Sequence, residues 1–416
     1  MAGTTDAVCV QRKPANQTGA GSSASPRDPL AGVRVLDFTI VMSGPMCTRA
    51  LADVGADVIK IEPPSGDVVR HRAPHRSGFS TYYASMNCGK RSVVLDLQTA
   101  EGKRIARELA QEADIVVENF RPGVMQRLGL DYEALSATNP RLIYCSISGF
   151  GQKGPMASAP AYAPVIHAAS GYELAYSEYQ RGGKRPANNG IFIADVLGAA
   201  HAVGAIQLAL YDRERTGLGQ SIDVALMDSV IGMLVYEMQA AQFPPDRPRQ
   251  VYEPVRSQDG YVMVAAVTPK NLEVLFDVIG YPQGKTDPRF ATVRSKEENW
   301  PALLEIIEAW TSQRSGVECE QVLMRAGVPC SRYRSVAEAM ADPQMEARGL
   351  FKELGEADQR FKVANLPYSL SRSLSSARPL LAKLGEHTEE VLGEVLGITA
   401  DECASLRARH VFGSAG

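Results

Sequence analysis

The feature that most constrains the fold is a regular exchange of short apolar runs and amphipathic stretches between residues 33 and 227. The apolar runs have the length and composition of buried strands. The stretches between them include residues 99–112, where Ile105 and Leu109 fall on one helical face. Strands that alternate with helices in this way predict a doubly wound, Rossmann-like α/β domain with a parallel sheet. The expected strands are residues 33–38, 56–62, 90–96, 114–118, 142–147 and 220–227.

Asp195 is the only charged residue between Arg185 and Asp212, and it closes a short apolar run that has strand character. Small and apolar residues follow it in a helical pattern that ends at Gly217 and Gly219. We therefore expect Asp195 at a strand-to-helix junction, where free N–H groups and the helix dipole favour a carboxylate. On position alone, a plain N-cap and a reactive carboxylate are equally good interpretations of this residue.

Composition and charge exclude several classes of partner. The formal net charge is −3, so neither a nucleic acid nor an anionic membrane surface is expected as a partner. The longest apolar stretch is interrupted by His201 and Gln207, which argues against a membrane span. The cysteines are scattered with no CxxC pair, which predicts reduced thiols in the cytosol or an organelle matrix, and we expect a cytoplasmic protein. No metal-ligand spacing and no GxGxxG motif occur, so neither a metal nor a nicotinamide cofactor is expected.

The chain of 416 residues is long enough for at least two domains. Residues 1–28 are rich in Ala, Gly, Ser and Thr and are expected to be a disordered tail, for which a targeting function stays open. Residues 29–228 hold the α/β pattern. Residues 229–255 combine a helical segment with a proline-rich connector, and residues 256–350 open with a new strand. The sequence therefore predicts a large domain, a linker and a smaller α/β domain.

Several residues follow the expected strands and should meet at the edge of the sheet where parallel sheets bind ligands. They are Val41 and Ser43 after the first strand, Arg70 after the second, Leu95 after the third, and Asn119, Phe120 and Arg127 after the fourth. Arginines, an aromatic ring and backbone donors suit a large ligand with phosphates and an adenine, such as coenzyme A. Taken singly, each residue fits an ordinary turn, core or surface role more readily, and only the set is informative.

A set of short segments runs in order along the chain, and together they carry a resemblance to a known family. The segments are residues 30–38, 43–45, 51–63, 66–67, 87–96, 114–123, 148–155, 216–228, 327–330, 342–343, 347–349 and 384–388. In this order they are similar to the class III CoA-transferases, the family of formyl-CoA:oxalate CoA-transferase, carnitine CoA-transferase and α-methylacyl-CoA racemase. The chain resembles this family from residue 30 to the C-terminus, and the segments are specific in combination.

The resemblance implies an interlaced homodimer whose large domain is built from both ends of the chain, with residues 351–416 returning to it. It also implies that Asp195 is the catalytic nucleophile, which carries coenzyme A as an aspartyl thioester between donor and acceptor. Coenzyme A and acyl-CoA are then substrates, and no tightly bound cofactor is implied. The residues that fall where the family contacts coenzyme A are Val41, Ser43, Leu95, Asn119, Phe120 and Arg127, with Arg70 near the same pocket.

Two other functions stay open at the level of sequence. A racemase of this superfamily would pair the aspartate with a histidine, but Tyr162 stands at that position, and a tyrosine of pKa ~10 is a poor base. His167 is the nearest histidine. The other alternative is a non-catalytic subunit that binds coenzyme A in a hetero-oligomer, and the intact Asp195 argues against it. Many members carry Asp where this chain has Ala163, so an altered substrate fit is expected.

No motif specifies the transferred acid. Arg181, Lys184 and Arg185 precede Asp195 and would suit a second carboxylate, although a solvated basic turn is the simpler interpretation. We therefore expect a CoA-transferase that acts on short-chain or dicarboxylic acids, with succinyl-CoA as one candidate donor.

Overall fold

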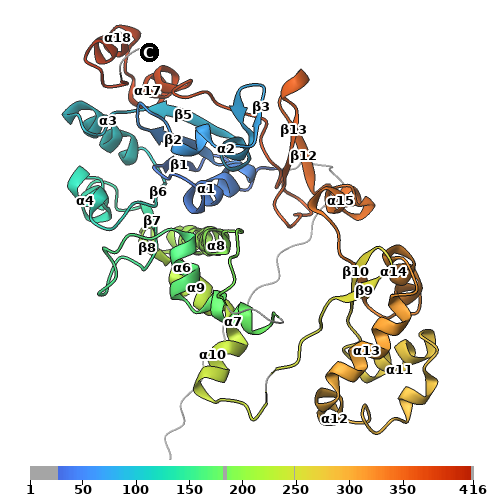
Figure 1. Ribbon diagram of the computed structural model, residues 1–416. Helices are drawn as coiled ribbons and strands as arrows, with labels where there is room; N and C mark the ends of the chain where they lie inside the picture. Colours follow the sequence, from blue (N-terminus) through green and yellow to red (C-terminus); the bar gives the residue numbers. More distant parts are fainter. Residues whose placement is uncertain (1–26, 181–184, 248, 414–416) are drawn as a thin grey trace, which may run out of the picture.

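The computed structural model describes residues 27–180, 185–247 and 249–413 (Figure 1). Its centre is a six-stranded sheet in the order β5-β2-β1-β6-β7-β8, and each neighbouring pair in it is parallel. This sheet confirms the expected α/β class. The tail expected at residues 1–28 lies almost wholly outside the described residues. The strands are β1 (Arg34–Asp37), β2 (Asp57–Glu62), β5 (Lys90–Val94), β6 (Ile115–Glu118), β7 (Ile143–Ser148) and β8 (Ser221–Ala225).

Each of these strands agrees with an expected run to within two residues at either end, but the strand expected to end at Asp195 was wrong. Residues 190–192 are irregular, and α8 (Ile193–Thr216) begins directly after them. Ile191 and Phe192 are exposed rather than buried between neighbouring strands. An apolar run of this length forms a strand only when a sheet covers it, and here the following helical residues decide the conformation.

Helices cover both faces of the sheet, and neighbouring residues of a strand enter different cores because the side-chain period of a strand is two. Val35, Ile115 and Ile143 pack on the face that α1 and α8 cover. Leu36 and Val116 pack on the opposite face, against α3 and α17. The helices not yet given are α1 (Ser43–Asp53), α3 (Ala100–Gln111) and α17 (Thr388–Leu396).

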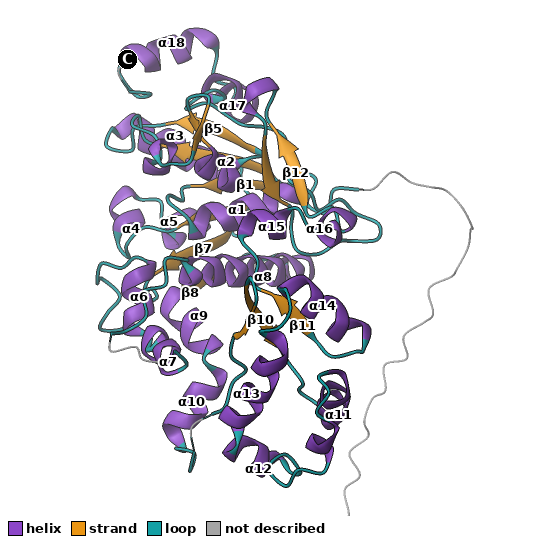
Figure 2. Ribbon diagram, turned by 45° about the vertical axis from the view of Figure 1, so that its right-hand side comes forward, coloured by secondary structure: helices purple, strands orange, loops and turns teal. Residues whose placement is uncertain are grey.

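Helix α8 has 24 residues and lies beside α1, β7 and β8 (Figure 2). Gly198 permits a close approach of α8 to α9 (Leu226–Met233), because a Cβ added there would lie 2.3 Å from Cδ2 of Leu226. By length and composition α8 could cross a membrane, but Ala199, Ala202 and Ile206 pack in the core beside the sheet, as in a core helix. Much of the helix nevertheless remains uncovered in the single chain.

A smaller unit begins at Val255 and stands beside the large sheet, joined to α10 (Val235–Gln242) by an extended stretch (Figure 1). It contains an antiparallel sheet in the order β11-β10-β9. Helices α11, α13 and α14 pack on this sheet around Phe276, Leu303 and Leu323. Its elements are β9 (Val255–Ser257), β10 (Gly260–Val264), α11 (Pro269–Val278), η2 (Pro282–Lys285), α12 (Val293–Glu298), α13 (Trp300–Thr311), α14 (Gly316–Arg325) and β11 (Cys330–Arg332).

The last part of the chain returns to the large sheet. Val391 and Leu392 of α17 and Leu406 of α18 lie in the same core as Leu36 of β1. Residues from both ends of the chain therefore share one core. The remaining elements are η1 (Val68–His71), β3 (His75–Arg76), β4 (Phe79–Ser80), α2 (Thr81–Asn87), α4 (Val124–Leu128), α5 (Tyr132–Ser136), α6 (Ala163–Ala169), α7 (Tyr172–Glu178), α9 (Leu226–Met233), α15 (Val336–Met340), α16 (Pro343–Ala347), β12 (Phe351–Leu354), η3 (Ala357–Gln359), β13 (Phe361–Ala364) and α18 (Ala400–Ala408).

The strand order reverses between β1 and β6. The chain runs outward from β1 to β2 and β5, then crosses back to β6 and continues to β7 and β8. At such a switch point the loops after two adjacent strands diverge, and open α/β sheets bind ligands in the crevice between them. Val41, Ser43, Asn119 and Phe120 follow the carboxyl ends of these two strands. A ligand site is therefore expected at this edge of the sheet.

Candidate functional site

Asp195 lies in the first turn of α8, and its side chain approaches Ser43, the first residue of α1. The N-cap of α8 is Phe192, so the interpretation of Asp195 as a plain N-cap is wrong. Burial raises the pKa of Asp195 to about 6, whereas hydrogen bonds from the hydroxyl and the backbone N–H of Ser43 lower it. Two helix N-termini therefore converge on one carboxylate, and both favour its negative charge.

The turn before α1 holds Val41 in a strained conformation. Val41 has a φ of 66°, a left-handed value that costs a β-branched residue about 1–3 kcal/mol. The buried carboxylate of Asp67 accepts a hydrogen bond from the Val41 N–H at 3.3 Å and another from the Val69 N–H at 3.1 Å. Backbone strain of this kind concentrates at ligand sites, where the surrounding structure enforces it.

Two buried lysines hold the two ends of the same turn. Lys60 Nζ donates to the carbonyl oxygen of Thr39 at 2.6 Å. Lys90 Nζ donates to the carbonyl oxygen of Pro45 at 3.0 Å. Gly44 lies between these carbonyls, and a Cβ added there would meet the Thr39 side chain at 2.3 Å. The lysines and the glycine together fix the path of residues 39–45.

Buried carboxylates balance the charges of these lysines. Asp67 lies 3.3 Å from Lys60, and Asp37 lies 3.0 Å from Lys90. Burial lowers the pKa of Lys90 to about 8. Burial raises the pKa of Asp37, but the positive charges of Lys90 and Lys60 lower it more, so the pKa lies below the ordinary value. The turn therefore rests on a compact network of compensated buried charges.

Asn119 ties the loop after β6 to the turn after β1. Its side-chain oxygen accepts from the Ile40 N–H at 2.8 Å, and its side-chain nitrogen donates to the Ile40 carbonyl at 2.8 Å. The same nitrogen lies 3.5 Å from Ser43 Oγ. Phe120 follows with its ring half-buried against the core, and Glu118 accepts a hydrogen bond from its N–H. Asn119 thus brings Ser43 and Phe120 to the same edge of the sheet.

The remaining predicted contact residues differ in their accessibility. Arg127 on α4 is exposed, and no carboxylate of the described residues lies within 4.0 Å of its guanidinium. Leu95 is fully buried, and Arg70 pairs with both carboxylate oxygens of Glu62 at 2.6 and 2.8 Å. Arg70 also stacks 4.1 Å from the ring centre of Tyr83. Arg127 is therefore available to a phosphate, while contact of Leu95 and Arg70 with a ligand stays a prediction.

The sequence did not predict the position of Tyr82, a residue of α2 that lies close enough to Asp195 for the charge of the carboxylate to shift the pKa of its hydroxyl. Burial raises the pKa of Tyr82, the charge of Asp195 raises it further, and Arg72 lowers it. The Tyr82 hydroxyl donates to Sδ of Met42 at 3.5 Å. The only signal in the sequence is an aromatic pair ahead of the motif at 87–96, which does not reveal its proximity to Asp195.

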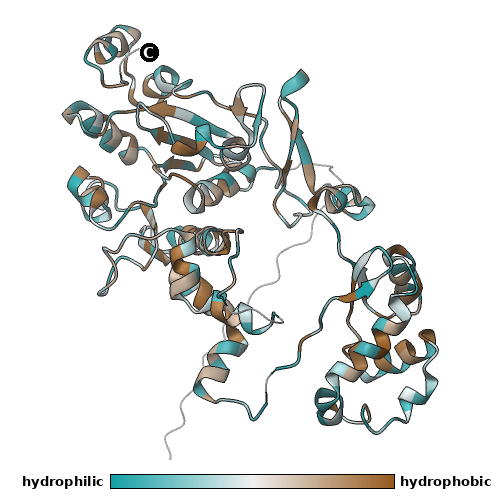
Figure 3. Ribbon diagram, viewed as in Figure 1, coloured by the Kyte–Doolittle hydropathy of each residue, from teal (hydrophilic) through white to brown (hydrophobic). Residues whose placement is uncertain are grey.

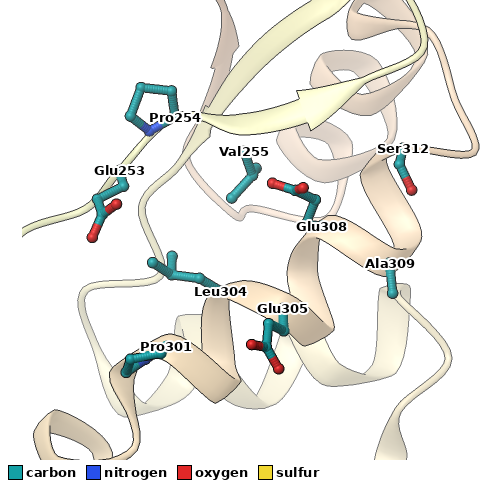
Figure 4. A pocket seen from close by; sticks show the side chains of 9 residues that line it. All are labelled: Glu253, Pro254, Val255, Pro301, Leu304, Glu305, Glu308, Ala309 and Ser312. Atoms are coloured by element: carbon teal, nitrogen blue, oxygen red, sulfur yellow. The ribbon is translucent and has the colours of Figure 1, made fainter. Parts of the chain in front are cut away.

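A pocket in the smaller unit is separate from this site. It lies between α13 and the segment before β9, and its lining includes Glu253, Glu305 and Glu308 (Figure 4). Three carboxylates disfavour the phosphates of a nucleotide-like ligand. Over the described ranges, no three side chains of His, Cys, Asp or Glu form a potential metal site. The edge of the sheet beside Asp195 remains the candidate site for a phosphorylated ligand.

Comparison with known proteins identifies the chemistry that this arrangement serves. Residues 30–388 match CoA-transferase family III. The chain belongs to this family. It is 37% identical over 342 residues to the acetyl-CoA:oxalate CoA-transferase of Acetobacter aceti, and the aligned region covers 80% of this chain and 87% of that protein. It is 35% identical over 389 residues to the succinate–glutarate CoA-transferase of Agrobacterium fabrum, 89% of this chain and 96% of that protein.

A solved structure agrees with the sequence comparison. The crystal structure of a CAIB/BAIF family protein from Brucella suis has a TM-score of 0.78 at 34% identity, and the match covers 89% of this chain and 100% of that one. The family that the motifs predicted is therefore confirmed, and the chain is a CoA-transferase. Enzymes of this type use CoA thioesters as substrates.

Proposed function

We propose that this family III enzyme transfers coenzyme A from an acyl-CoA to a free carboxylic acid through a thioester on Asp195. The observation that carries the proposal is the convergence of the α1 and α8 N-termini on this half-buried carboxylate. A carboxylate with a pKa of about 6 is mostly ionised at neutral pH and remains less stabilised than one in water. Asp195 is therefore suited to act as a nucleophile.

The reaction consists of four exchanges at carbonyl carbons. Asp195 attacks the donor thioester and releases CoA thiolate, which leaves a mixed anhydride between the aspartate and the acyl group. The thiolate attacks the aspartyl carbonyl and releases the donor acid, which leaves an aspartyl-CoA thioester. The acceptor carboxylate attacks this thioester and again releases the thiolate. The thiolate then attacks the acyl carbonyl of the acceptor, giving the new acyl-CoA and free Asp195.

Each exchange passes through a tetrahedral oxyanion. The hydroxyl and the backbone N–H of Ser43 are the donors that interact with Asp195, and they would be the donors to such an oxyanion. One such donor is typically worth about 3–4 kcal/mol in the transition state. The fixed turn around Val41 supports the same assignment, because donors that do not have to reorganise stabilise charge best.

Coenzyme A fits the crevice at the switch point of the sheet in this proposal. The loops of Val41 and Asn119 form its walls, and Phe120 offers an aromatic surface for the adenine or the pantetheine arm. Arg127 is the exposed cation that would meet a phosphate, while Arg70 and Leu95 support the crevice from within the protein.

A dicarboxylic acid is the acceptor that the surroundings of Asp195 favour. The two curated relatives act, by name, on oxalate and on succinate and glutarate, all of which are dicarboxylates. Arg72 is the exposed C-cap residue of η1. Its charge lowers the pKa of the Tyr82 hydroxyl, whereas the charge of Asp195 raises it. We therefore propose that Arg72, rather than the basic residues expected before Asp195, binds the second carboxylate of the acceptor acid. Of those, Arg185 is exposed, and residues 181 and 184 lie outside the described ranges.

We further propose a homodimer in the cytoplasm. Hydrophobic residues remain uncovered on α8 and α10 in the single chain, among them Leu208, Tyr211 and Val235. Figure 3 shows hydrophobic turns on α8 and α9 near β7 and β8. The cysteines within the described ranges are buried free thiols, which supports a reducing compartment.

The racemase alternative is disfavoured by the surroundings of Asp195. Tyr162 is exposed, and the one histidine nearby, His167, uses Nε2 to accept a hydrogen bond from the Ala194 N–H. Neither side chain is thus arranged as a second base for a proton shuttle. Incorporation of deuterium from heavy water into a 2-methylacyl-CoA, without any CoA transfer, would support the racemase instead.

The test combines a substrate panel with trapping of the intermediate. The enzyme is incubated with acetyl-CoA or succinyl-CoA and a series of free acids, and new CoA esters are followed by mass spectrometry. Hydroxylamine added during turnover should convert Asp195 to a hydroxamate. Asp195→Asn should abolish transfer and trapping, whereas Asp228→Asn, at an exposed acid in the first turn of α9, should retain both. A hydroxamate at another residue would refute the assignment.

A further inference from the structure

His167 is a buried histidine whose ring supports the first turn of α8. It lies on α6 with none of its surface exposed, and its Nε2 accepts a hydrogen bond from the backbone N–H of Ala194 at 3.2 Å. Ala194 directly precedes Asp195. The N-cap residue Phe192 has no side-chain oxygen to offer. His167 therefore supplies, from another helix, the acceptor that a capping side chain normally supplies.

The hydrogen bond fixes the tautomer of the ring. Because Nε2 accepts, it carries no proton, and the proton of the neutral ring is on Nδ1. Nδ1 lies 3.8 Å from Oε1 of Glu173 and makes no hydrogen bond within the described part of the chain. Burial lowers the pKa of His167, although the charge of Glu173 opposes this shift. A neutral ring with its proton on Nδ1, the nitrogen nearer to Glu173, agrees with these observations.

Glu173 and its neighbour also hold the segment that leads into α8. Oε1 of Glu173 accepts from the Asn189 N–H at 3.4 Å. The Asn189 side chain donates to the Tyr172 hydroxyl at 2.7 Å, and the Tyr172 ring packs edge-on against His167 with 5.5 Å between ring centres. Helices α6 and α7 thus fix residues 189–194 from one side, while Ser43 meets Asp195 from the other.

We propose that His167 is a positioning residue, which fixes Asp195 for attack through the Ala194 N–H. The proposal rests on the proposed function of Asp195 and extends it to a residue that does not touch the substrate. Loss of the acceptor would leave the Ala194 N–H buried without a partner and allow the first turn to shift. A displacement of about 1 Å at a reacting group can cost roughly 100-fold in rate.

Two substitutions separate the acceptor from the bulk of the ring. His167→Leu removes the acceptor, and kcat should fall about 10- to 100-fold while KM for the acyl-CoA stays within about twofold. His167→Gln offers an amide oxygen to the same N–H, and kcat should stay within about threefold of wild type. The control is His387→Gln, because buried His387 also accepts a backbone N–H, that of Ser92 at 3.3 Å. This control should behave as wild type.

Two kinetic results would overturn the proposal. One is a His167→Leu variant with the kcat of wild type. The other is an equal loss in the Leu and Gln variants, which would show that the ring matters only for packing.

A spectroscopic measurement on the wild-type protein keeps the proposal testable if the Leu variant does not fold. In the ¹⁵N spectrum of histidine-labelled enzyme, the signals of His167 are assigned by their loss in the Gln variant. They should show a proton on Nδ1 and none on Nε2 at neutral pH. The opposite tautomer, or a charged ring, would refute the proposal. This readout needs no turnover, so a failure of the proposed function is distinguishable from a failure of the role of His167.

Discussion

Ser43 and Asp195 face each other at the N-termini of two helices, and the hydroxyl and N–H of Ser43 both interact with the Asp195 carboxylate. Burial alone would favour the protonated acid. The two donors and the helix dipoles recover part of the stability of the anion. The result is a carboxylate with a pKa of about 6, which ionises in the range where the enzyme is expected to work.

The first prediction follows from this pKa. The attacking form is the anion, so kcat/KM should fall as the pH falls through about 6. Ser43→Ala removes a donor that stabilises the anion, so the acid limb should move upward by roughly one pH unit. The rate–pH profile measures both effects. Ser257→Ala, in the smaller unit, is the matched control, and an unshifted limb in Ser43→Ala would contradict the prediction.

The second prediction concerns the charges beneath the turn of residues 39–45. Lys90→Met leaves the buried Asp37 carboxylate without its ion pair and the carbonyl of Pro45 without its donor. Breaking a buried pair in this way should lower the free energy of unfolding by about 3–5 kcal/mol, measured by urea denaturation. Lys270→Met, at an exposed lysine of α11, should change it by less than about 0.5 kcal/mol. Equal stability of the two variants would show that the pair contributes nothing.

The parallel strands could be predicted because their signal is local. Residues 115–117, for example, are buried on both faces and form a continuous apolar run in the sequence. Asp195 stood out in the same way, as a lone charge in an apolar stretch, and the family resemblance supplied the role that we propose for it. The strand before it was wrong because nothing in a short apolar run shows whether a sheet will cover it.

The support of the site could not be predicted, because it depends on contacts between distant parts of the chain. In the sequence, Lys60 and Lys90 are ordinary residues of two expected strands, and only the folded sheet brings them to the turn that carries Val41. Tyr82 and His167 approach Asp195 from α2 and α6 in the same way. Arg70 looked available to a ligand until the fold paired it with Glu62.

The third prediction concerns the choice of acid. Arg72 is held at the end of η1, where its N–H donates to the Val69 carbonyl at 3.1 Å and its carbonyl accepts from Ser80 Oγ at 2.5 Å. If its guanidinium meets the second carboxylate, Arg72→Gln should raise KM for a dicarboxylic acceptor about tenfold and leave KM for a monocarboxylic acid of equal length within about twofold. Initial rates with paired acceptors measure the ratio.

The control for this prediction is Arg76→Gln, which removes an exposed arginine of β3 from the same basic segment. It should leave the ratio of the two KM values unchanged. An equal effect of both substitutions would indicate a general electrostatic contribution and would remove Arg72 as a specific contact.

The fourth prediction concerns the uncovered side of α8. Leu208 and Tyr211 are 71% and 67% exposed in the single chain, although they belong to the helix that carries Asp195. Apolar side chains gathered on one helix indicate an interaction surface, and in the homodimer that we propose a second copy covers it. Sedimentation velocity should therefore find a dimer for the wild-type protein, and the double variant Leu208→Glu/Tyr211→Glu should shift it toward monomer. Val293→Glu, at an equally exposed residue of α12, should remain dimeric.

The same variants test whether assembly matters for the site. Charges on α8 that separate the subunits should also lower transfer activity, because loss of the covering surface exposes the helix whose first turn holds Asp195. The loss should be reduced at high protein concentration, where mass action restores the dimer. A monomeric wild-type protein, or a double variant that stays dimeric, would mean that another partner or solvent covers this face of α8.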